Sequence, residues 1–281
     1  MYIDLTPDQK TLRTTLRNYF DALMTPERRR SVRGMEGGKL YRELIRQIGK
    51  DGWLGVGWPK EYGGGGMTMV EQMIFLEEQR RANAPFPFVT VSTVGPALMD
   101  FGTEEQKREF LPRILAGECH FSIGYSEPNA GTDLASLSTA AVKEGDEWVI
   151  NGTKMFTSGA TDTDYIWLAA RTDPNAPKHK GITMFIVPAD AKGFSASPIH
   201  TVGGSATAMS YYENVRVPED AVVGGVNGGW KLITTQLNHE RVGLAAFGSA
   251  CYSRTEKVIE WARGTETSDG RRPVMKQTRS T

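Results

Sequence analysis

Two short segments of the sequence combine hydroxyl, aromatic and backbone groups of the kind that bind a flat polar ligand. The first, Tyr125–Leu134, reads Tyr-Ser-Glu-Pro-Asn-Ala-Gly-Thr-Asp-Leu and follows the apolar run Phe121-Ser122-Ile123. Such a loop offers backbone N–H groups and short hydroxyls to a carbonyl or to the edge of a polar aromatic ring. An ordinary turn has the same composition, so both interpretations stay open from this segment alone.

The second segment, Asn151–Ala160, places Phe156 beside Thr157 and Ser158. An aromatic ring next to hydroxyls can stack on a flat cofactor and bond its edge. A strand followed by a loop explains the same residues equally well. The glycine-rich segment Gly52–Gly66 lacks the preceding strand and the closing Gly-Lys-Ser/Thr of a phosphate loop, so we interpret it as a structural linker.

A third candidate is the acidic and basic pair Glu240-Arg241 within an apolar helical pattern. Such a pair on a helix is most often solvated. The alternative interpretation is that Glu240 is a catalytic base in a water-poor pocket. Desolvation there would raise its pKa and make it a stronger base. His239 has no metal-ligand partner at usable spacing, so we predict no metal site.

The elements that must position these residues change type along the chain. Capping boxes at Thr6–Gln9, Thr68–Glu71 and Thr103–Gln106 predict helices, and they indicate an all-α N-terminal domain over residues 1–118. Short strand patterns then follow without intervening helices, and Trp148–Ile150 before Asn151-Gly152 predicts a β-hairpin. We therefore expect a middle antiparallel β-barrel domain over residues 119–226.

Helical periodicity returns near Asn227 and continues to about Arg263. A single helix cannot bury its apolar stripe alone, so residues 227–281 read as the start of a C-terminal α-helical bundle that is apparently truncated. The expected fold class is therefore α+β multidomain.

The bulk composition restricts the function classes. The 281 residues carry 33 basic and 33 acidic side chains, which argues against nucleic acid or an anionic membrane as the main partner. No apolar stretch approaches the ~20 residues of a membrane span, and no export signal begins the chain, so we expect a cytoplasmic protein. Cys119 and Cys251 stand in no metal or redox spacing and are expected to be reduced core thiols.

Taken in order, five motifs of the chain resemble those of acyl-CoA dehydrogenases. They are Gly52–Gly66, the segment from Phe101 to Glu118, Tyr125–Leu134, Asn151–Gly159, and the segment from Val215 to Trp230. The resemblance implies a helical domain, a β-barrel domain and a C-terminal helical bundle. It also implies that FAD lies between the β-domain and the bundle, with acyl-CoA on the other face of the flavin.

Carried over by position, the resemblance implies roles for single residues. Tyr125 and Ser126 would border the flavin, with Ser126 bonding its polar edge. Phe156 replaces the tryptophan that packs against the isoalloxazine in the family, and it stacks without donating a hydrogen bond. Ser158 would bond near N5 or O4 of the flavin. Thr132 would contact the CoA thioester arm.

The segment Leu237–Arg241 matches a family arrangement in which the catalytic glutamate lies on the first long helix, immediately before an arginine. This implies that Glu240 removes the α-proton while a hydride passes to flavin N5, which yields a trans-2-enoyl-CoA. Arg241 would shape the site, and Gly243 would leave room for the acyl group.

Three functional interpretations remain open. The first is a working dehydrogenase that passes electrons to an electron-transfer flavoprotein. The second is a non-catalytic or half-site subunit that completes the FAD site of a related chain, because Gly203 stands where the family often has arginine. Some actinobacterial sterol side-chain dehydrogenases, which resemble this chain, pair unlike subunits in this way, so we expect a homo-oligomer or a heterotetramer. The third keeps the fold but changes the chemistry to a flavin oxidase or monooxygenase.

Overall fold

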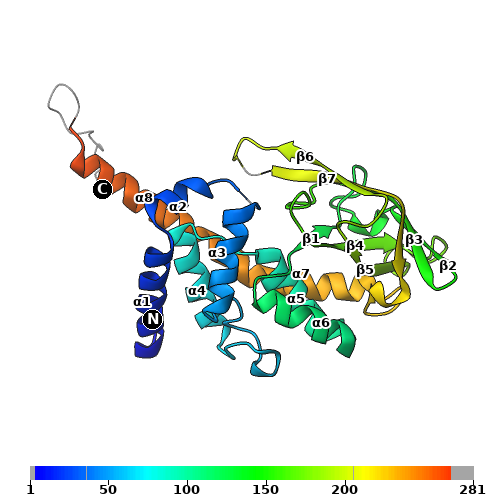
Figure 1. Cartoon of the computed structure of the whole chain (residues 1–281), viewed down its shortest axis with the longest axis horizontal. Helices are drawn as coiled ribbons and strands as arrows, with labels where there is room; N and C mark the ends of the chain where they lie inside the picture. Colours follow the sequence, from blue (N-terminus) through cyan, green and yellow to red (C-terminus); the bar gives the residue numbers. More distant parts are fainter. Residues whose placement is uncertain (1–3, 36, 205, 267–281) are drawn as a thin grey trace, which may run out of the picture.

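The structure, a computed structural model, describes residues 4–35, 37–204 and 206–266. Helices come first along the chain, a sheet follows, and two helices end the described part (Figure 1). The predicted fold class, with helical regions on either side of a β-domain, is confirmed. The domain limits at residues 118 and 226 stay predictions.

The N-terminal region is helical as predicted, and all three capping boxes form at Thr6, Thr68 and Thr103. Its α-helices are α1 (Pro7–Leu23), α2 (Pro26–Ser31), α3 (Lys39–Lys50), α4 (Met69–Ala82), α5 (Gly95–Phe101) and α6 (Glu104–Leu115). Short 3-10 turns also occur along the chain: η1 (Lys60–Tyr62), η3 (Leu134–Ser136) and η4 (Glu219–Ala221). One π-helical turn, η2 (Thr90–Val94), is buried and leads directly into α5. Periodicity did not predict this turn, because its apolar and small residues suit a helix or a strand.

The glycine-rich linker is anchored by Trp58, which is buried. Its indole Nε1 donates to the carbonyl of Val91 over 3.0 Å. A Cβ at Gly95 would lie 2.1 Å from the indole ring, so only glycine lets α5 start this close to Trp58. The linker interpretation of this segment therefore agrees with its packing.

The middle region forms one sheet with the strand order β6-β7-β3-β2-β4-β5-β8, and β1 pairs with β4. The strands are β1 (Phe121–Gly124), β2 (Ala140–Glu144), β3 (Glu147–Lys154), β4 (Tyr165–Arg171), β5 (Ile182–Pro188), β6 (Phe194–His200), β7 (Ala206–Pro218) and β8 (Val222–Val223). Most pairings are antiparallel, as predicted. Two contacts are parallel, β1 with β4 and a short one between β2 and β4.

The hairpin predicted at Asn151-Gly152 is wrong. Both residues lie inside β3, and the chain reverses earlier, at Gly145-Asp146 between β2 and β3. The pairing of β3 with β7 shifts register between Ile150 and Gly152, so the Asn-Gly pair forms a bulge. A Cβ at Gly152 would lie 2.5 Å from Thr139 Oγ1, which explains the glycine without a turn.

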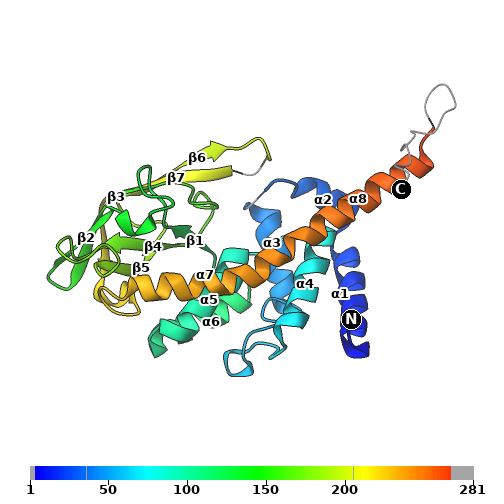
Figure 2. The same ribbon diagram turned by 180° about the vertical axis from the view of Figure 1, so that it is seen from behind.

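Two helices, α7 (Gly229–Ala245) and α8 (Phe247–Gly264), form a nearly continuous rod at the C-terminal end of the described chain. Figure 2 shows α7 passing along the sheet and α5, and α8 crossing α4 before it extends beyond the other helices. Helix α8 exposes Tyr252, Val258 and Trp261. In the described ranges, no helix is both long and apolar enough to cross a membrane. Cys119 is buried, but Cys251 is exposed, so the expectation of two core thiols is wrong for Cys251.

An ionic contact joins the helical region to the sheet domain. Arg42 of α3 donates through Nη1 to Asp164 over 3.1 Å and through Nε to Asp162 over 3.3 Å. Asp164 also accepts the backbone N–H of His120 over 2.8 Å. Because the Arg42 side chain is only 17% exposed, solvent screens this contact weakly.

We expect Arg42→Met to lower the free energy of unfolding by about 1.5–3 kcal/mol, the range for hydrogen bonds to charged groups. Chemical denaturation followed by tryptophan fluorescence measures the change. Lys39→Met is the matched control on the same helix, since the Lys39 side chain is 91% exposed. Equal effects of the two substitutions would show that Arg42 contributes no more than a surface charge.

Candidate active site

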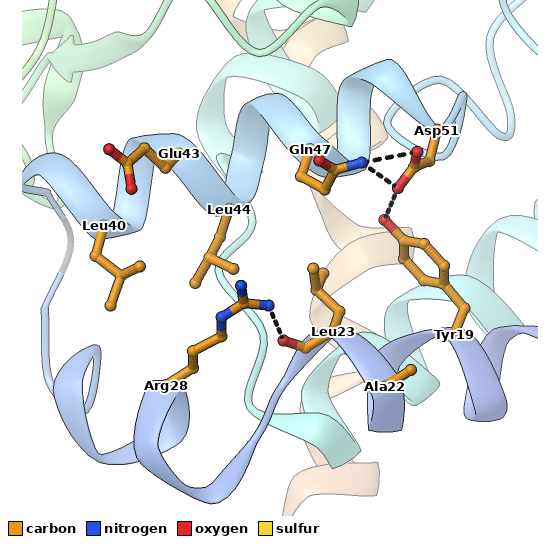
Figure 3. Close-up of a pocket in the computed structure, with 9 residues that line it drawn as sticks. All are labelled: Tyr19, Ala22, Leu23, Arg28, Leu40, Glu43, Leu44, Gln47 and Asp51. Carbon is orange, nitrogen blue, oxygen red and sulfur yellow. Dashed lines mark hydrogen bonds between the residues drawn. The ribbon is translucent and has the colours of Figure 1, made fainter.

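One hollow on the described surface lies between α1, α2 and α3 and encloses about 440 Å³ (Figure 3). Several of its polar groups bond one another or the backbone. Tyr19 Oη donates to Asp51 over 2.8 Å, Gln47 donates to Asp51 over 2.9 Å, and Arg28 donates to the carbonyl of Leu23 over 2.8 Å. None of the residues predicted to do chemistry lines it, so we place the active site elsewhere.

A second cavity, of about 230 Å³, gathers five of the predicted site residues. Tyr125 and Ser126 enter it from the loop after β1, Phe156 and Ser158 from the segment after β3, and Glu240 from α7. Its remaining lining is largely apolar and consists of Val89, Ile123, Met155 and Leu237. Residues more than a hundred positions apart in the sequence therefore meet around one space.

The aromatic side chain at this cavity is held in an unusual backbone conformation. Phe156 has a φ of 63° and its side chain is 61% exposed. A left-handed conformation is costly for a bulky residue and is kept where the surrounding structure imposes it. Here the N–H of Met155 donates to the carbonyl of Ser126 over 2.8 Å, and the N–H of Thr157 donates to that of Ala208 over 2.9 Å. The ring is thus exposed at the cavity and not packed into the core.

Hydroxyl groups flank this ring. Ser158 is exposed, and its Oγ donates to Thr207 Oγ1 over 3.1 Å, which leaves its lone pairs available. Ser126 is half-buried at the cavity wall, and the bond from Met155 to its carbonyl holds its backbone in place. An aromatic face bordered by hydroxyls suits a planar ring system with a polar edge.

Behind the wall lies a buried ion pair, which sequence reasoning missed. Lys154 Nζ donates to Glu127 Oε1 over 2.9 Å and to the carbonyl of Tyr125 over 3.0 Å, and both charged side chains are almost fully buried. Glu127 also accepts the backbone N–H groups of Ser138 and Thr139 over 2.7 and 2.8 Å. The pair therefore ties the loop that carries Tyr125 and Ser126 to the end of β3. A lysine inside a strand pattern was the signal that could have revealed it.

The ionisation of this pair follows from its partners. Burial alone would raise the pKa of Glu127, but the Lys154 ammonium and the hydrogen bonds outweigh it and lower that pKa to about 2. Burial lowers the pKa of Lys154 to about 8, and Glu127 opposes this shift. Both groups are therefore mainly ionised at neutral pH.

Glu240 is half-buried on α7 and lines the cavity together with Leu237. Burial raises the pKa of its carboxyl group. A carboxylate with a raised pKa in a mostly apolar wall is a stronger base than one in water. The role of Glu240 as the base stays a prediction.

Three predicted residues do not line the cavity. Thr132 is exposed on the turn after Ala130, and Arg241 is exposed on α7. Gly243 is buried, and a Cβ there would lie 2.1 Å from the ring of Phe88. The ring of Phe88, not open space, therefore lies beside Gly243. The substrate and catalytic roles of these three residues stay predictions. Over the described part of the chain, no group of His, Cys, Asp and Glu side chains is arranged to hold a metal ion.

Comparison with known proteins defines the class to which this fold and site belong. The chain matches the family "Acyl-CoA dehydrogenase, N-terminal domain" over residues 6–118 and "Acyl-CoA dehydrogenase, middle domain" over residues 122–215. It is 53% identical to acyl-CoA dehydrogenase FadE26 of Mycobacterium tuberculosis, over 98% of this chain and 70% of that protein. It is 54% identical to FadE29 of the same organism, over 93% of this chain and 68% of that protein.

Solved structures give the same result. The steroid ACAD Tcur3481-Tcur3483 superposes with a TM-score of 0.90 at 59% identity, over 94% of this chain and 69% of that one. The ChsE4-ChsE5 complex from Mycobacterium tuberculosis superposes with a TM-score of 0.89 at 53% identity, over 97% of this chain and 70% of that one. The chain belongs to the acyl-CoA dehydrogenase family.

The chain is accordingly an FAD-dependent oxidoreductase that dehydrogenates acyl-CoA. The residues present fit this cofactor. Phe156 offers an exposed face held by the backbone, and Ser126 and Ser158 border it with hydroxyls.

Proposed function

We propose that the chain catalyses α,β-dehydrogenation of an acyl-CoA thioester to the trans-2-enoyl-CoA, with Glu240 as the base that removes the α-proton. The observation that supports the proposal is one cavity lined by Glu240 and by Ser126, Phe156 and Ser158, the residues that we propose face the flavin. A base and a hydride acceptor must face the same substrate, and this cavity has both sides.

The residues of the chain have separate tasks in this reaction. Ser126 and Ser158 bond the polar edge of the flavin, and Phe156 packs against its ring. FAD, when bound, supplies the acceptor for the hydride that leaves Cβ. Glu240 takes the α-proton onto its carboxylate, while Val89 and Leu237 in the cavity wall limit the access of water.

Three further assignments within this proposal rest on the family pattern. Thr132 contacts the CoA arm, and Arg241 shapes the site from the outer side of α7. Gly243 leaves room for the acyl group, provided that the ring of Phe88 moves aside. An electron-transfer flavoprotein is the proposed acceptor of the electrons. The cytoplasmic location also stays a prediction.

A second candidate function is that of a subunit which shares its FAD site with a homologous chain. Two observations favour it. The names of the similar structures Tcur3481-Tcur3483 and ChsE4-ChsE5 each join two proteins, and α8 exposes Tyr252, Val258 and Trp261 on a helix that extends beyond the other helices. Large exposed apolar side chains of this kind are typical of subunit contacts. We therefore propose that the chain forms a homo-oligomer or a heterotetramer. As substrate we propose a steroid or fatty acyl-CoA, because one of the similar structures is a steroid ACAD.

An absorbance spectrum of the purified protein, produced alone and together with a homologous chain, tests both candidates. We expect a flavin band that bleaches under anaerobic conditions when octanoyl-CoA or a sterol side-chain CoA thioester is added. Bleaching only with the second chain would favour the shared site. A flavin band that neither thioester reduces in any combination would contradict the proposed reaction.

A further inference from the structure

A buried side-chain network connects the flavin-facing loop to the helix that carries Glu240. Gln236 of α7 is fully buried, and its Oε1 accepts from Tyr125 Oη and from Trp167 Nε1, the latter over 2.9 Å. Trp167 Nε1 also lies 3.2 Å from Tyr125 Oη, so the three polar groups contact one another. They come from the loop after β1, from β4 and from α7.

Both ends of this network lead to the reaction site. Tyr125 is among the residues that line the cavity, and its carbonyl accepts from Lys154 of the buried ion pair. Gln236 precedes Glu240 by four residues, so the two side chains lie one above the other on the same face of α7. The Tyr125–Gln236 hydrogen bond therefore links this turn of α7 directly to the loop that carries Ser126.

The network is not arranged for stability alone. Among the residues that the structure describes, Gln236 Nε2 finds no hydrogen-bond partner. A buried donor without a partner has lost its hydration and gained no bond in return, which an apolar side chain of similar size avoids. The oxygen of the same amide accepts from both Tyr125 and Trp167, so it is the atom that joins the two elements.

We propose that Tyr125 and Gln236 are positioning residues that hold the Glu240 carboxylate at a set distance from the flavin-facing loop. The inference rests on the proposed function of Glu240 as the base. It adds that the phenol and the amide transmit the position of the loop to the helix, without touching the reacting atoms themselves. A shift of the base by about 1 Å is expected to cost on the order of a hundredfold in rate.

The test uses Tyr125→Phe, Gln236→Leu and the double variant in the full chain, produced with the homologous chain if flavin binding needs it. Tyr125→Phe keeps the ring at the cavity and removes only the hydroxyl. We expect kcat to fall on the order of tenfold to a hundredfold, with KM for octanoyl-CoA and the flavin spectrum unchanged. The apparent pKa in the pH profile of kcat/KM should shift, and the double variant should lose no more than the single variants, since all break one link.

Two further measurements separate this inference from its alternatives. Amide hydrogen exchange, measured without substrate, should become faster in α7 around Glu240 in both single variants. Thr234→Ala, on the exposed side of the same helix, is the control and should change neither exchange nor kcat. Unchanged exchange together with an unchanged pH profile would overturn the inference. Faster exchange in a protein that dehydrogenates no thioester would keep the link and remove the proposed function.

Discussion

Replacing Glu240 with glutamine should reduce dehydrogenation by about 10²–10⁴-fold, the range for loss of a general base. Glutamine keeps the size and the polarity of the side chain at the cavity wall, but it cannot accept the α-proton. Flavin content and the affinity for acyl-CoA should stay close to those of the unsubstituted protein. Anaerobic bleaching of the flavin by octanoyl-CoA, followed by stopped-flow absorbance, measures the chemical step directly.

The pH dependence of the unsubstituted protein provides a second check on the same residue. Burial raises the pKa of Glu240, and only its ionised form accepts a proton. The rate should therefore rise with pH through a pKa above the ordinary value for glutamate, and this rise should be absent from the residual rate of the variant. Glu260→Gln, an exposed change on α8, is the control and should retain full activity. Retained dehydrogenation in Glu240→Gln would move the base to another residue.

Breaking the buried ion pair should have the largest effect on stability. We expect Lys154→Met to lower the free energy of unfolding by about 3–5 kcal/mol, because it leaves the Glu127 carboxylate buried without its cation. The loop that carries Tyr125 and Ser126 then loses its tie to β3, so flavin binding should weaken as well. Urea denaturation and flavin titration measure the two effects separately.

A matched surface pair on the same sheet domain supplies the control. Lys143 and Glu219 are 2.6 Å apart, but both side chains are well exposed, so Lys143→Met should change stability little. Acid gives an independent check. Because the folded pKa of Glu127 is lowered to about 2 from its ordinary 4.5, its contribution is present above pH 4.5 and is lost as the pH falls through 2. The stability difference between Lys154→Met and the unsubstituted protein should shrink over that range, and a constant difference would contradict the pairing.

Local signals in the sequence were sufficient for most of the elements. The helices that begin at Thr6, Thr68 and Thr103 need only neighbouring residues for their caps, and those signals predicted them correctly. The β4 and β5 segments consist mostly of apolar residues, so their composition alone predicts that these strands are buried. The hairpin turn predicted at Asn151-Gly152 was wrong because a bulge and a hairpin turn favour the same residues. Only the pairing of β3 with β7 distinguishes the two.

The candidate site was also predictable only in part from the sequence. The motif order pointed to Ser126, Phe156 and Glu240, which the structure places around one cavity. Glu127, the partner of Lys154, lies 27 positions away in the chain. Trp167, a partner of Gln236, lies 69 positions away. Periodicity and spacing report only on near neighbours, so a polar residue in an apolar pattern reveals a buried partner without identifying it. The left-handed backbone at Phe156 is likewise imposed by tertiary contacts.

The close contact of Gly243 with Phe88 limits the order in which substitutions can accumulate at this site. A methyl group at position 243 would overlap the phenyl ring of Phe88, so alanine becomes acceptable only after residue 88 is made smaller or displaced. A smaller residue 88 beside an unchanged glycine would leave a gap, which is unfavourable by itself. The two positions therefore depend on each other, and a pocket of different shape is reached by paired changes more readily than by single ones.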